Sequence, residues 1–481
     1  MQIVRFVGDS RCTDQAYREA IADEERAVFD VVSSDRNAIL NFTMGASPIR
    51  VPLSRTARDL VELALSIYVA DTFLRRNDQP DRWTRQFDFL FPITDPDLWR
   101  TVETTLVETL EALSGDHFSF SFPQTRPLPA WPMRRQRLPR GFDAVCLFSG
   151  GFDSLLGAHA LLSEGKIVLL VGHQAEGVTS SSQKRLAEGL RRVFPGSFAF
   201  VQCRGGVSKI RCPRFAHYAV LERTYRMRSF LFLALGVAFA TAIGAPALYI
   251  PENGLIALNP PLGLSRIGSL STRTAHPRFL WQFRKLAETL GLFKGEFKNP
   301  FMFQSKTDLA EALAPELQQL VLESVSCSNV NLRLLGARAD QRHCGHCIPC
   351  LYRRFALAAA GLDDPSHYVK DAFRRLGTLS SYMQANLRML VAFAARVARM
   401  HDAQLQGLVI AHGWFPPQVG GIIGPVPTED YQPWANMLAR WAKKTLEQVD
   451  ELCLMNVKHY SRPTTGAIGK VKYYFRKIFK T

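Results

Sequence analysis

The middle of the chain alternates short apolar runs with longer stretches in which apolar residues recur every three or four positions. Apolar runs at residues 143–149, 166–172 and 197–203 predict buried strands, and helical patterns at 153–165 and 180–194 lie between them. Since parallel strands need long crossover connections, the alternation predicts an α/β fold with a parallel sheet. Ligands of such sheets bind beyond the carboxyl ends of the strands.

The regions on either side follow different patterns. Residues 1–135 read as short strands with two amphipathic helices, at 56–76 and 96–114, and a proline- and arginine-rich stretch follows at 123–141. Long helical patterns return at 371–400 and 431–455. We therefore expect three domains: an N-terminal α+β accessory domain with its linker, a parallel-sheet core, and a helical C-terminal extension with a basic tail, at residues 1–138, 139–365 and 366–481.

Residues 229–250 form the most apolar stretch of the chain, "SFLFLALGVAFATAIGAPALYI". Gly244 and Pro246 divide it, because proline interrupts helical hydrogen bonding. The remaining helix of about fifteen residues is shorter than the roughly 20 that cross a bilayer. We therefore predict a core helix followed by a core strand, and no transmembrane segment.

Composition points to a folded protein with an acidic partner. The chain has 481 residues, of which 47% are hydrophobic and 21% charged, and its formal net charge is +16. Such a charge favours nucleotides, nucleic acid, an anionic surface or an acidic protein as partners. Nine cysteines, an odd number, argue against a full disulfide framework, and the first residues do not resemble a secretory signal. We expect a cytoplasmic protein with reduced thiols.

A phosphate site is predicted where the first strand of the core meets its helix, in "LFSGGFDSLL". Two glycines let backbone approach an anion, and the helix that follows offers free N–H groups. A carboxylate at this corner would repel a phosphate unless it held Mg²⁺ or oriented the loop. The alternative is an ordinary strand–turn–helix corner with polar helix caps. The predicted nucleotide-binding residues here are Ser149, Gly150, Gly151, Asp153 and Ser154.

Four cysteines downstream predict a metal site. Cys344, Cys347 and Cys350 follow one another at three-residue steps, and Cys327 precedes them. Four thiolates suit tetrahedral zinc or an iron–sulfur cluster, and a closed set of four leaves no open position for water. His343 or His346 could substitute as a ligand. The alternative is inert buried cysteine.

These two motifs carry a family resemblance over roughly residues 143–360. "SGGFDS" resembles the signature of the PP-loop ATP pyrophosphatases, which have a Rossmann-like, adenine nucleotide α-hydrolase-like core. The further pattern "SC…CGHCIPC…R" is similar to QueC, the 7-cyano-7-deazaguanine synthase. The resemblance implies that ATP is cleaved between its α and β phosphates. AMP is then attached to the carboxylate of 7-carboxy-7-deazaguanine, ammonia attacks, and a structural Zn²⁺ is held by the cysteines. It also implies nucleotide and catalytic roles for further residues: Gln174, Arg228 and Lys306 beside Asp153.

The substrate segment departs from the family pattern. QueC enzymes usually carry a tyrosine–proline–aspartate–cysteine–arginine stretch, whereas residues 251–280 read "PENGLIALNPPLGLSRIGSLSTRTAHPRFL". Glu252 could accept hydrogen bonds from a guanine-like edge, Arg273 or Arg278 could hold a carboxylate, and His276 could move a proton. Asn253 fits the family match. The alternative is a surface loop with solvated arginines, and Lys306 has the competing role of a first-turn lysine behind a Ser305–Asp308 capping box.

The N-terminal region contains the stretches "DLVELALSIYVADTFLRR" and "LEALSGDHFSFSFP", at residues 59–76 and 110–123. With these stretches and a helical C-terminal region, the chain resembles QueC-like proteins from bacterial anti-phage systems. This implies an amine nucleophile other than ammonia, such as the N-terminus of a partner protein from the same defence operon. Two alternatives stay open. One is a PP-loop tRNA-modifying enzyme, favoured by the basic tail, although nucleic acid is the less favoured partner. The other is a non-catalytic module that keeps the fold for assembly or sensing.

Overall fold

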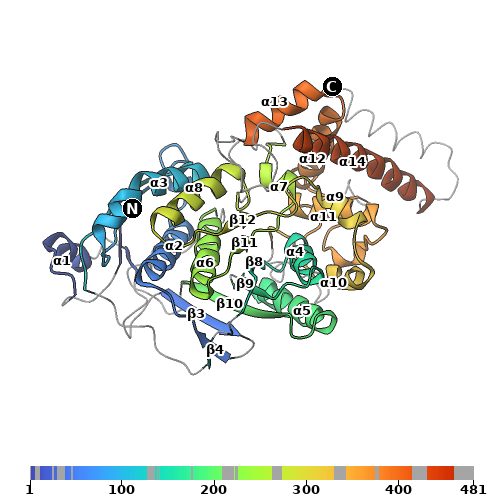
Figure 1. Cartoon of the computed structure of the whole chain (residues 1–481). Helices are drawn as coiled ribbons and strands as arrows, with labels where there is room; N and C mark the ends of the chain where they lie inside the picture. Colours follow the sequence, from blue (N-terminus) through green and yellow to red (C-terminus); the bar gives the residue numbers. More distant parts are fainter. Residues whose placement is uncertain are drawn as a thin grey trace.

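A central eight-stranded sheet organises the chain in the computed structural model (Figure 1). The structure describes residues 2–5, 11–23, 27–29, 38–44, 47–126, 136–137, 139, 141–174, 177–207, 222, 226–262, 273–329, 343–373, 379–413 and 431–459. The strand order is β12-β11-β8-β9-β10-β3-β4-β7. Five strands of the predicted core form its parallel part: β8 (Ala144–Leu147), β9 (Val168–His173), β10 (Phe198–Val207), β11 (Ala247–Tyr249) and β12 (Glu296–Lys298).

The order of these five strands places a topological switch point at the first one. In chain order they lie 3-2-1-4-5, because β9 and β10 continue on one side of β8 while β11 and β12 continue on the other. The carboxyl ends of β8 and β11 therefore face a common crevice, which is the usual ligand position in open α/β sheets. This confirms the predicted parallel-sheet α/β core, and the strand order is compatible with a Rossmann-like fold.

Helices cover both faces of the sheet. Alternate residues of β8 point to opposite faces: Val145 and Leu147 pack on one side and Ala144 and Cys146 on the other. One face carries α6 (Arg228–Ile243), α2 (Arg55–Phe73) and α8 (Pro277–Thr289), and the other carries α4 (Phe152–Ser163), α5 (Gly177–Val193) and α11 (Ile348–Ala359). Short elements complete this part: α7 (Gly254–Leu258), α9 (Lys306–Glu311), η4 (Pro315–Leu317), α10 (Gln318–Leu322) and η6 (Pro365–His367).

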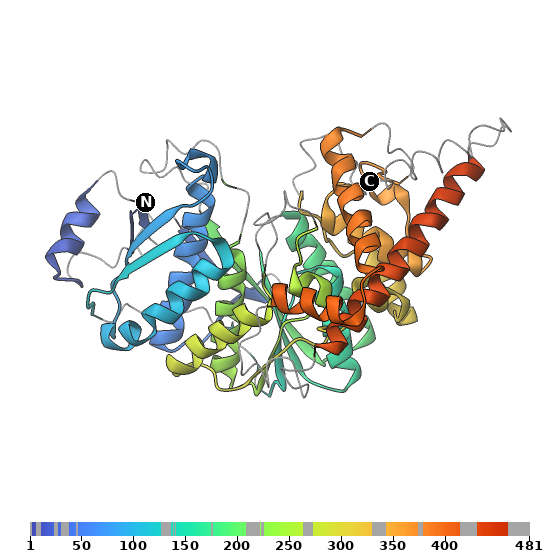
Figure 2. The same cartoon turned by 90° about the horizontal axis from the view of Figure 1, so that it is seen from above.

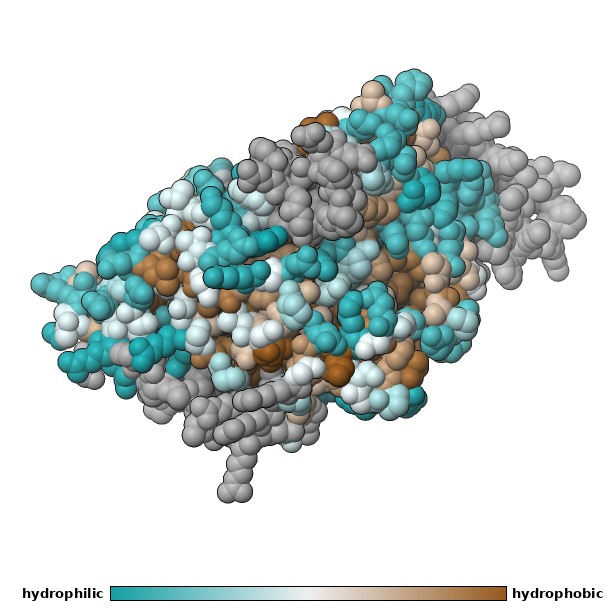
Figure 3. Space-filling view, viewed as in Figure 1, coloured by the Kyte–Doolittle hydropathy of each residue, from teal (hydrophilic) through white to brown (hydrophobic). Residues whose placement is uncertain are grey.

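The apolar stretch at 229–250 is the predicted core helix and core strand. Helix α6 is buried over most of its length and ends at Gly244, whose φ of +69° closes the helix. Strand β11 follows inside the sheet. Among the described residues, no helix is both long and apolar enough to cross a membrane. On the face shown in Figure 3, hydrophobic residues are interspersed with hydrophilic ones.

The N-terminal region contributes to two sheets. Strands β1 (Gln2–Arg5), β2 (Ala27–Phe29), β5 (Gln86–Leu90) and β6 (His117–Ser121) form a separate parallel sheet with α1 (Gln15–Ala22), η1 (Arg76–Asp78) and α3 (Pro96–Ser114) nearby. By contrast, β3 (Ala38–Met44), β4 (Ser47–Arg50) and β7 (Gln136–Arg137) extend the central sheet, and β3 pairs antiparallel with β10. The central sheet thus crosses residue 138, and the three-domain division stays a prediction.

Helices dominate the C-terminal region, as its periodicity predicts. They are α12 (Ser381–Val397), α13 (Asp402–Gly413) and α14 (Gln432–His459). Helix α14 packs on α12 and α13 and also reaches α7, α9 and α11 of the core. Figure 2 shows the core between the N-terminal elements and these helices. The basic tail at 460–481 lies outside the described residues.

Candidate functional site: a phosphate loop beside a cysteine cluster

The predicted phosphate loop spans the gap between β8 and α4. Gly150 has a φ of +81°, and a Cβ built on it would lie 2.8 Å from Gln183 Cγ, so glycine is required here for both reasons. Gly151 is the N-cap of α4 and offers no side-chain cap. The first N–H groups of this twelve-residue helix are therefore available to an anion.

The two serines of the loop bond to each other and to the backbone. Ser149 Oγ lies 3.2 Å from Ser154 Oγ and accepts the Gly151 N–H at 3.3 Å, while Ser154 Oγ donates to the Gly151 carbonyl at 3.0 Å. Both hydroxyls thus converge on the N-terminus of α4, as the sequence predicts.

Polar side chains from α5 hold the back of the loop. Ser182 Oγ donates to the Gly150 carbonyl at 3.0 Å, and Gln183 Nε2 donates to the Ser149 carbonyl at 3.2 Å. Gln202 in turn donates to Gln183 Oε1 at 2.9 Å. The sequence analysis did not predict these three residues. The feature that could have indicated them is a polar side chain at a buried position, on the inner face of an amphipathic helix or within a core strand.

Asp153 lies at the switch point and joins β8 to β11. Its carboxylate accepts the Asn253 N–H at 3.1 Å and Asn253 Nδ2 at 2.6 Å, and it forms an ion pair with Lys306 Nζ. Lys306 Nζ also lies 4.8 Å from the centre of the Phe152 ring. Asn253 and Lys306 follow Asp153 by 100 and 153 positions in the sequence. The structure thus brings together three predicted residues from distant segments.

The position of Lys306 fits both of its interpretations, as a first-turn lysine behind a capping box and as a residue that contacts phosphate. It is the first residue of α9, behind a capping box in which Ser305 and Asp308 bond reciprocally. Its amine is nevertheless buried against Asp153 at the phosphate loop. The capping box fixes the start of the helix, and the start of the helix points the cation at the loop.

Glu252 lies next to this pair. Burial and the neighbouring Asp153 raise the pKa of Glu252 to about 8, against the opposing influence of Lys306 and of the Ala275 N–H, which donates to Glu252 Oε2 at 3.2 Å. Asn299 holds the Glu252 backbone through both its N–H and its carbonyl. A carboxyl group that is partly protonated near neutral pH can both donate and accept hydrogen bonds.

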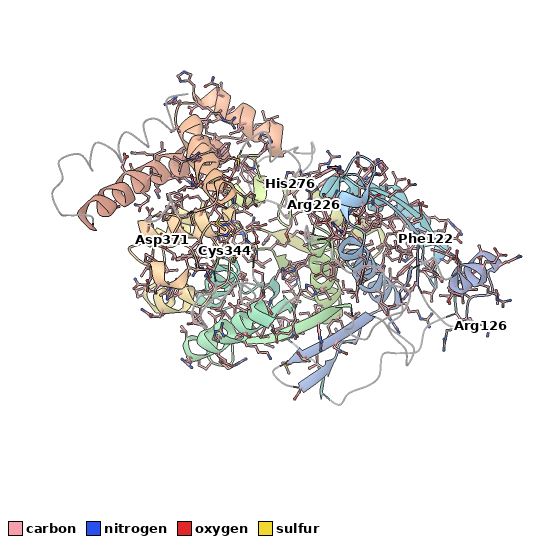
Figure 4. All side chains as sticks on the ribbon, turned by 180° about the vertical axis from the view of Figure 1, so that it is seen from behind. Phe122, Arg126, Arg226, His276, Cys344 and Asp371 are labelled. Atoms are coloured by element: carbon pink, nitrogen blue, oxygen red, sulfur yellow. The ribbon has the colours of Figure 1, made fainter. Side chains whose placement is uncertain are left out.

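The side chains of Arg273 and His276 form hydrogen bonds with helices outside the core. Arg273 Nη1 donates to the Ala112 carbonyl at the end of α3 at 2.8 Å, and His276 Nε2 donates to the His412 carbonyl at the end of α13 at 2.8 Å. Burial lowers the pKa of His276 to about 4, so its ring is neutral at physiological pH. Figure 4 shows His276 between the N-terminal elements and the C-terminal helices. Both side chains therefore fasten their segment to the flanking regions.

Two predicted residues remain, Gln174 for nucleotide binding and Arg228 for catalysis. Gln174 follows β9 and its N–H donates to the Cys203 carbonyl at 2.7 Å. Arg228 begins α6. Burial, together with the nearby Arg228 charge, lowers the pKa of His173 to about 3.

The four predicted cysteines form one cluster, in the region where Cys344 is labelled in Figure 4. Their sulfurs lie within 4.8 Å of one another, with 3.8 Å between Cys344 and Cys350 and 4.0 Å between Cys347 and Cys327. Four Zn–S bonds of about 2.3 Å in a tetrahedron place sulfurs about 3.8 Å apart. The donor set and its spacing therefore fit Zn²⁺.

The cluster's surroundings also suit a metal–thiolate site. Gly345 has a φ of +82°, and a Cβ on it would lie 1.9 Å from the Lys370 carbonyl oxygen, so the turn between two ligands needs glycine. Backbone N–H groups of Asn329 and Cys344 point at Cys327 Sγ at 3.3 and 3.4 Å. Such N–H···S bonds favour the thiolate form that binds metal.

Comparison with known proteins finds relatives named 7-cyano-7-deazaguanine synthase, among them the following three. The protein of Methanococcus vannielii is 25% identical over 247 residues, which cover 47% of this chain and 98% of the relative. That of Rhizorhabdus wittichii is 25% identical over 248 residues, covering 47% and 96%. That of Xanthomonas campestris pv. campestris strain B100 is 30% identical over 155 residues, covering 28% and 64%.

No family model and no solved structure matches the chain. The Methanococcus vannielii and Rhizorhabdus wittichii relatives are matched over nearly their whole length. The same alignments cover less than half of this chain. Together with the phosphate loop at the switch point and the cysteine cluster beside it, they support a QueC-like family.

Proposed function

We propose that this protein is an ATP-dependent enzyme that adenylates the carboxylate of a 7-deazaguanine and passes the acyl group to an amine. The observation that carries the proposal is the convergence of Asp153, Asn253 and Lys306 on the loop between β8 and α4. This convergence lies at the sheet position where open α/β folds bind nucleotides.

The first step places ATP on the loop. The N-terminus of α4 and the hydroxyls of Ser149 and Ser154 bind the phosphates, and the Lys306 amine adds positive charge. Asp153 would hold Mg²⁺, which when bound offsets phosphate charge. A substrate carboxylate oxygen attacks the α-phosphorus, the bond to the β-phosphate oxygen breaks, and pyrophosphate leaves.

The second step consumes the acyl-adenylate. The amine nitrogen attacks the acyl carbon, a C–N bond forms, the C–O bond to AMP breaks, and the amine proton passes to solvent or a nearby base. Glu252 can hydrogen-bond a guanine-like edge from beside Asp153. Gln174 and Arg228 would bind nucleotide or substrate from the ends of neighbouring elements, and Asn253 keeps Asp153 oriented.

The regions outside the QueC-like part support a proposal for the nature of the amine. The chain's N-terminal and C-terminal regions resemble those of QatC from the bacterial Qat anti-phage system. We propose that the amine is ammonia or the N-terminus of a partner protein from the same defence operon, in the cytoplasm. Arg273 and His276, which join the substrate segment to both flanking regions, support a role for those regions in shaping the site.

The test is AMP release. We expect the purified protein with ATP, Mg²⁺ and 7-carboxy-7-deazaguanine to form AMP and pyrophosphate. Asp153→Asn should slow this by about 100-fold or more, measured on protein that circular dichroism shows to be folded. Asp143→Asn is the matched control, since Asp143 lies at the opposite end of β8 and bonds the Ile167 N–H. Full activity of Asp153→Asn would contradict the proposed site, and no AMP with any deazaguanine carboxylate would contradict the proposed reaction.

A further inference from the structure

Three consecutive residues join the phosphate loop to the cysteine cluster. The Val325 N–H donates to the Gly150 carbonyl at 2.9 Å, the Ser326 N–H donates to His343 Nε2 at 3.2 Å, and Cys327 is a member of the cluster. His343 itself precedes Cys344, a second member. The backbone of Ser326 is therefore fixed from the loop on one side and from the cluster on the other.

The Ser326 side chain faces the start of α4. A Cβ built on Gly151 would lie 3.3 Å from Ser149 Oγ and 3.8 Å from Ser326 Oγ, so hydroxyls approach this N-cap from two segments. Among the described residues, Ser326 Oγ has no hydrogen-bond partner, whereas Ser149 and Ser154 bond to each other. A free hydroxyl at a helix N-terminus is a donor aimed where an anion binds.

We propose that Ser326 is a further phosphate-binding residue of this site, and that metal held by the cysteine cluster places it there. The proposal rests on the proposed function, because it assumes that the loop binds nucleotide phosphate. Its ligand is the pyrophosphate portion of ATP. Metal at the cluster fixes Cys327, and Cys327 fixes the neighbouring serine.

Binding measurements on the full chain test the first part. By titration calorimetry with MgATP and with magnesium pyrophosphate, Ser326→Ala should bind about tenfold more weakly than the parent protein. Ser326→Thr, which keeps the hydroxyl, should restore most of the affinity. Ser328→Ala is the matched control, because Ser328 stands at the same distance from Cys327 along the chain but is exposed. Zinc content, measured for each variant, should stay unchanged.

Removal of the metal tests the second part. In chelator-treated protein that circular dichroism shows to be folded, we expect a similar loss of affinity, and Ser326→Ala should then cause no further loss. Equal affinities of the metal-loaded parent and Ser326→Ala would overturn the role of the serine. A full tenfold effect of Ser326→Ala in metal-free protein would overturn placement by the metal. If the parent binds neither ligand, the proposed function itself falls.

Discussion

Asp153 holds together three segments that meet only in the folded chain. Its carboxylate receives the Asn253 backbone and side chain and pairs with Lys306, so one residue sets the positions of β8, the end of β11 and the start of α9. A buried ion pair with additional hydrogen bonds is costly to break on one side, because the remaining charge loses its partner. The same contacts that orient Asp153 for catalysis thus make it a structural residue.

Gly150 offers a test of the loop's conformation. We expect Gly150→Ala to lower the free energy of unfolding by about 2 kcal/mol, because it adds left-handed strain and a clash with Gln183. Binding of MgATP should weaken in parallel. Urea titration and calorimetry measure the two effects. Gly407→Ala is the control, since Gly407 lies in α13 with nothing within 4 Å of its Cβ position, and it should be neutral or stabilising. An unaffected Gly150→Ala protein would contradict the loop described here.

Glu252 offers a test by pH. Its pKa is raised from 4.5 to about 8 in the folded protein, so the folded state keeps a proton that the unfolded chain releases at lower pH. The stability contributed by this group is present below about pH 4.5 and is lost as the pH rises through 8. Glu252→Gln stays neutral throughout. Its melting temperature relative to the parent protein should therefore increase steadily between pH 5 and pH 8, and parallel profiles would show that the pKa is not raised.

Sequence predicted site residues where a motif concentrates chemistry in a few positions. Ser149 to Ser154 lie together as expected because they are neighbours in the sequence. The four cysteines lie together as expected because their spacing is typical of one metal site. The sequence did not predict three further residues that contact the loop, Ser182, Gln183 and Ser326. Their contacts form only in the folded chain, and a single serine or glutamine belongs to no recognisable sequence motif.

At the scale of elements, residues 273–276 connect the core to both flanking regions. Arg273 bonds the end of α3, the Thr274 hydroxyl lies 2.8 Å from that of Ser229 on α6, the Ala275 N–H bonds Glu252, and His276 bonds the end of α13. Carbonyls at helix C-termini lack intrahelical partners and carry negative partial charge, which suits both donors. This short segment thus transmits the position of two outer helices to Glu252.

Arg273 should consequently act as a positioning residue. We expect Arg273→Ala to lower the free energy of unfolding by about 1 kcal/mol, through loss of its part-buried hydrogen bond to the Ala112 carbonyl. It should also raise the KM for the acid substrate more than it lowers kcat, as measured by AMP release.

Arg284→Ala provides the comparison for this variant, because Arg284 on α8 forms a surface i,i+4 ion pair with Glu288. Its effect on stability should stay within about 0.5 kcal/mol. A normal stability of Arg273→Ala, combined with a large rise in KM, would instead indicate direct contact with substrate.

Long periodic elements were predicted closely. Short ones were predicted only where a neighbouring signal marked them, such as the apolar helix before β11 and the capping box at the start of α9. The expected helix at 96–114 is α3, and the expected helix at 56–76 is α2, which covers Arg55–Phe73. Strand β12 has three residues and α9 has six, which is too few for either period to emerge. Their positions depend on pairing with β11 and on the Ser305 capping box.

For the whole molecule, one apolar core reaches all three regions of the chain. It includes Trp99 from α3, Leu147 from β8 and Trp434 from α14, all buried. Trp434 packs edge-on against Phe303, and Lys444 on the same helix bonds Asp308 of α9. The C-terminal helices therefore support the element that carries Lys306.

A shared core predicts cooperative unfolding. We expect tryptophan fluorescence and circular dichroism to report one main urea transition, because no region keeps its buried surface once another unfolds. Hydrogen exchange should give β3 and β10 similar protection. Separate transitions, with an N-terminal fragment that remains folded, would instead support independent domains divided at residue 138. The sequence could not predict whether the N-terminal region folds independently of the core. The pattern of apolar and polar residues within β3 or β10 does not indicate that the two strands pair.

The antiparallel pairing of β3 with β10 also bears on synthesis of the chain. Residues 38–44 leave the ribosome roughly 150 positions before residues 198–207, and at roughly 5–20 residues per second the first strand waits about 10 to 30 seconds for its neighbour. During that interval the backbone N–H and C=O groups that later pair with β10 are open to other nascent chains. Yield in a living cell should therefore depend on translation speed between these two strands and on chaperones that shield the waiting one.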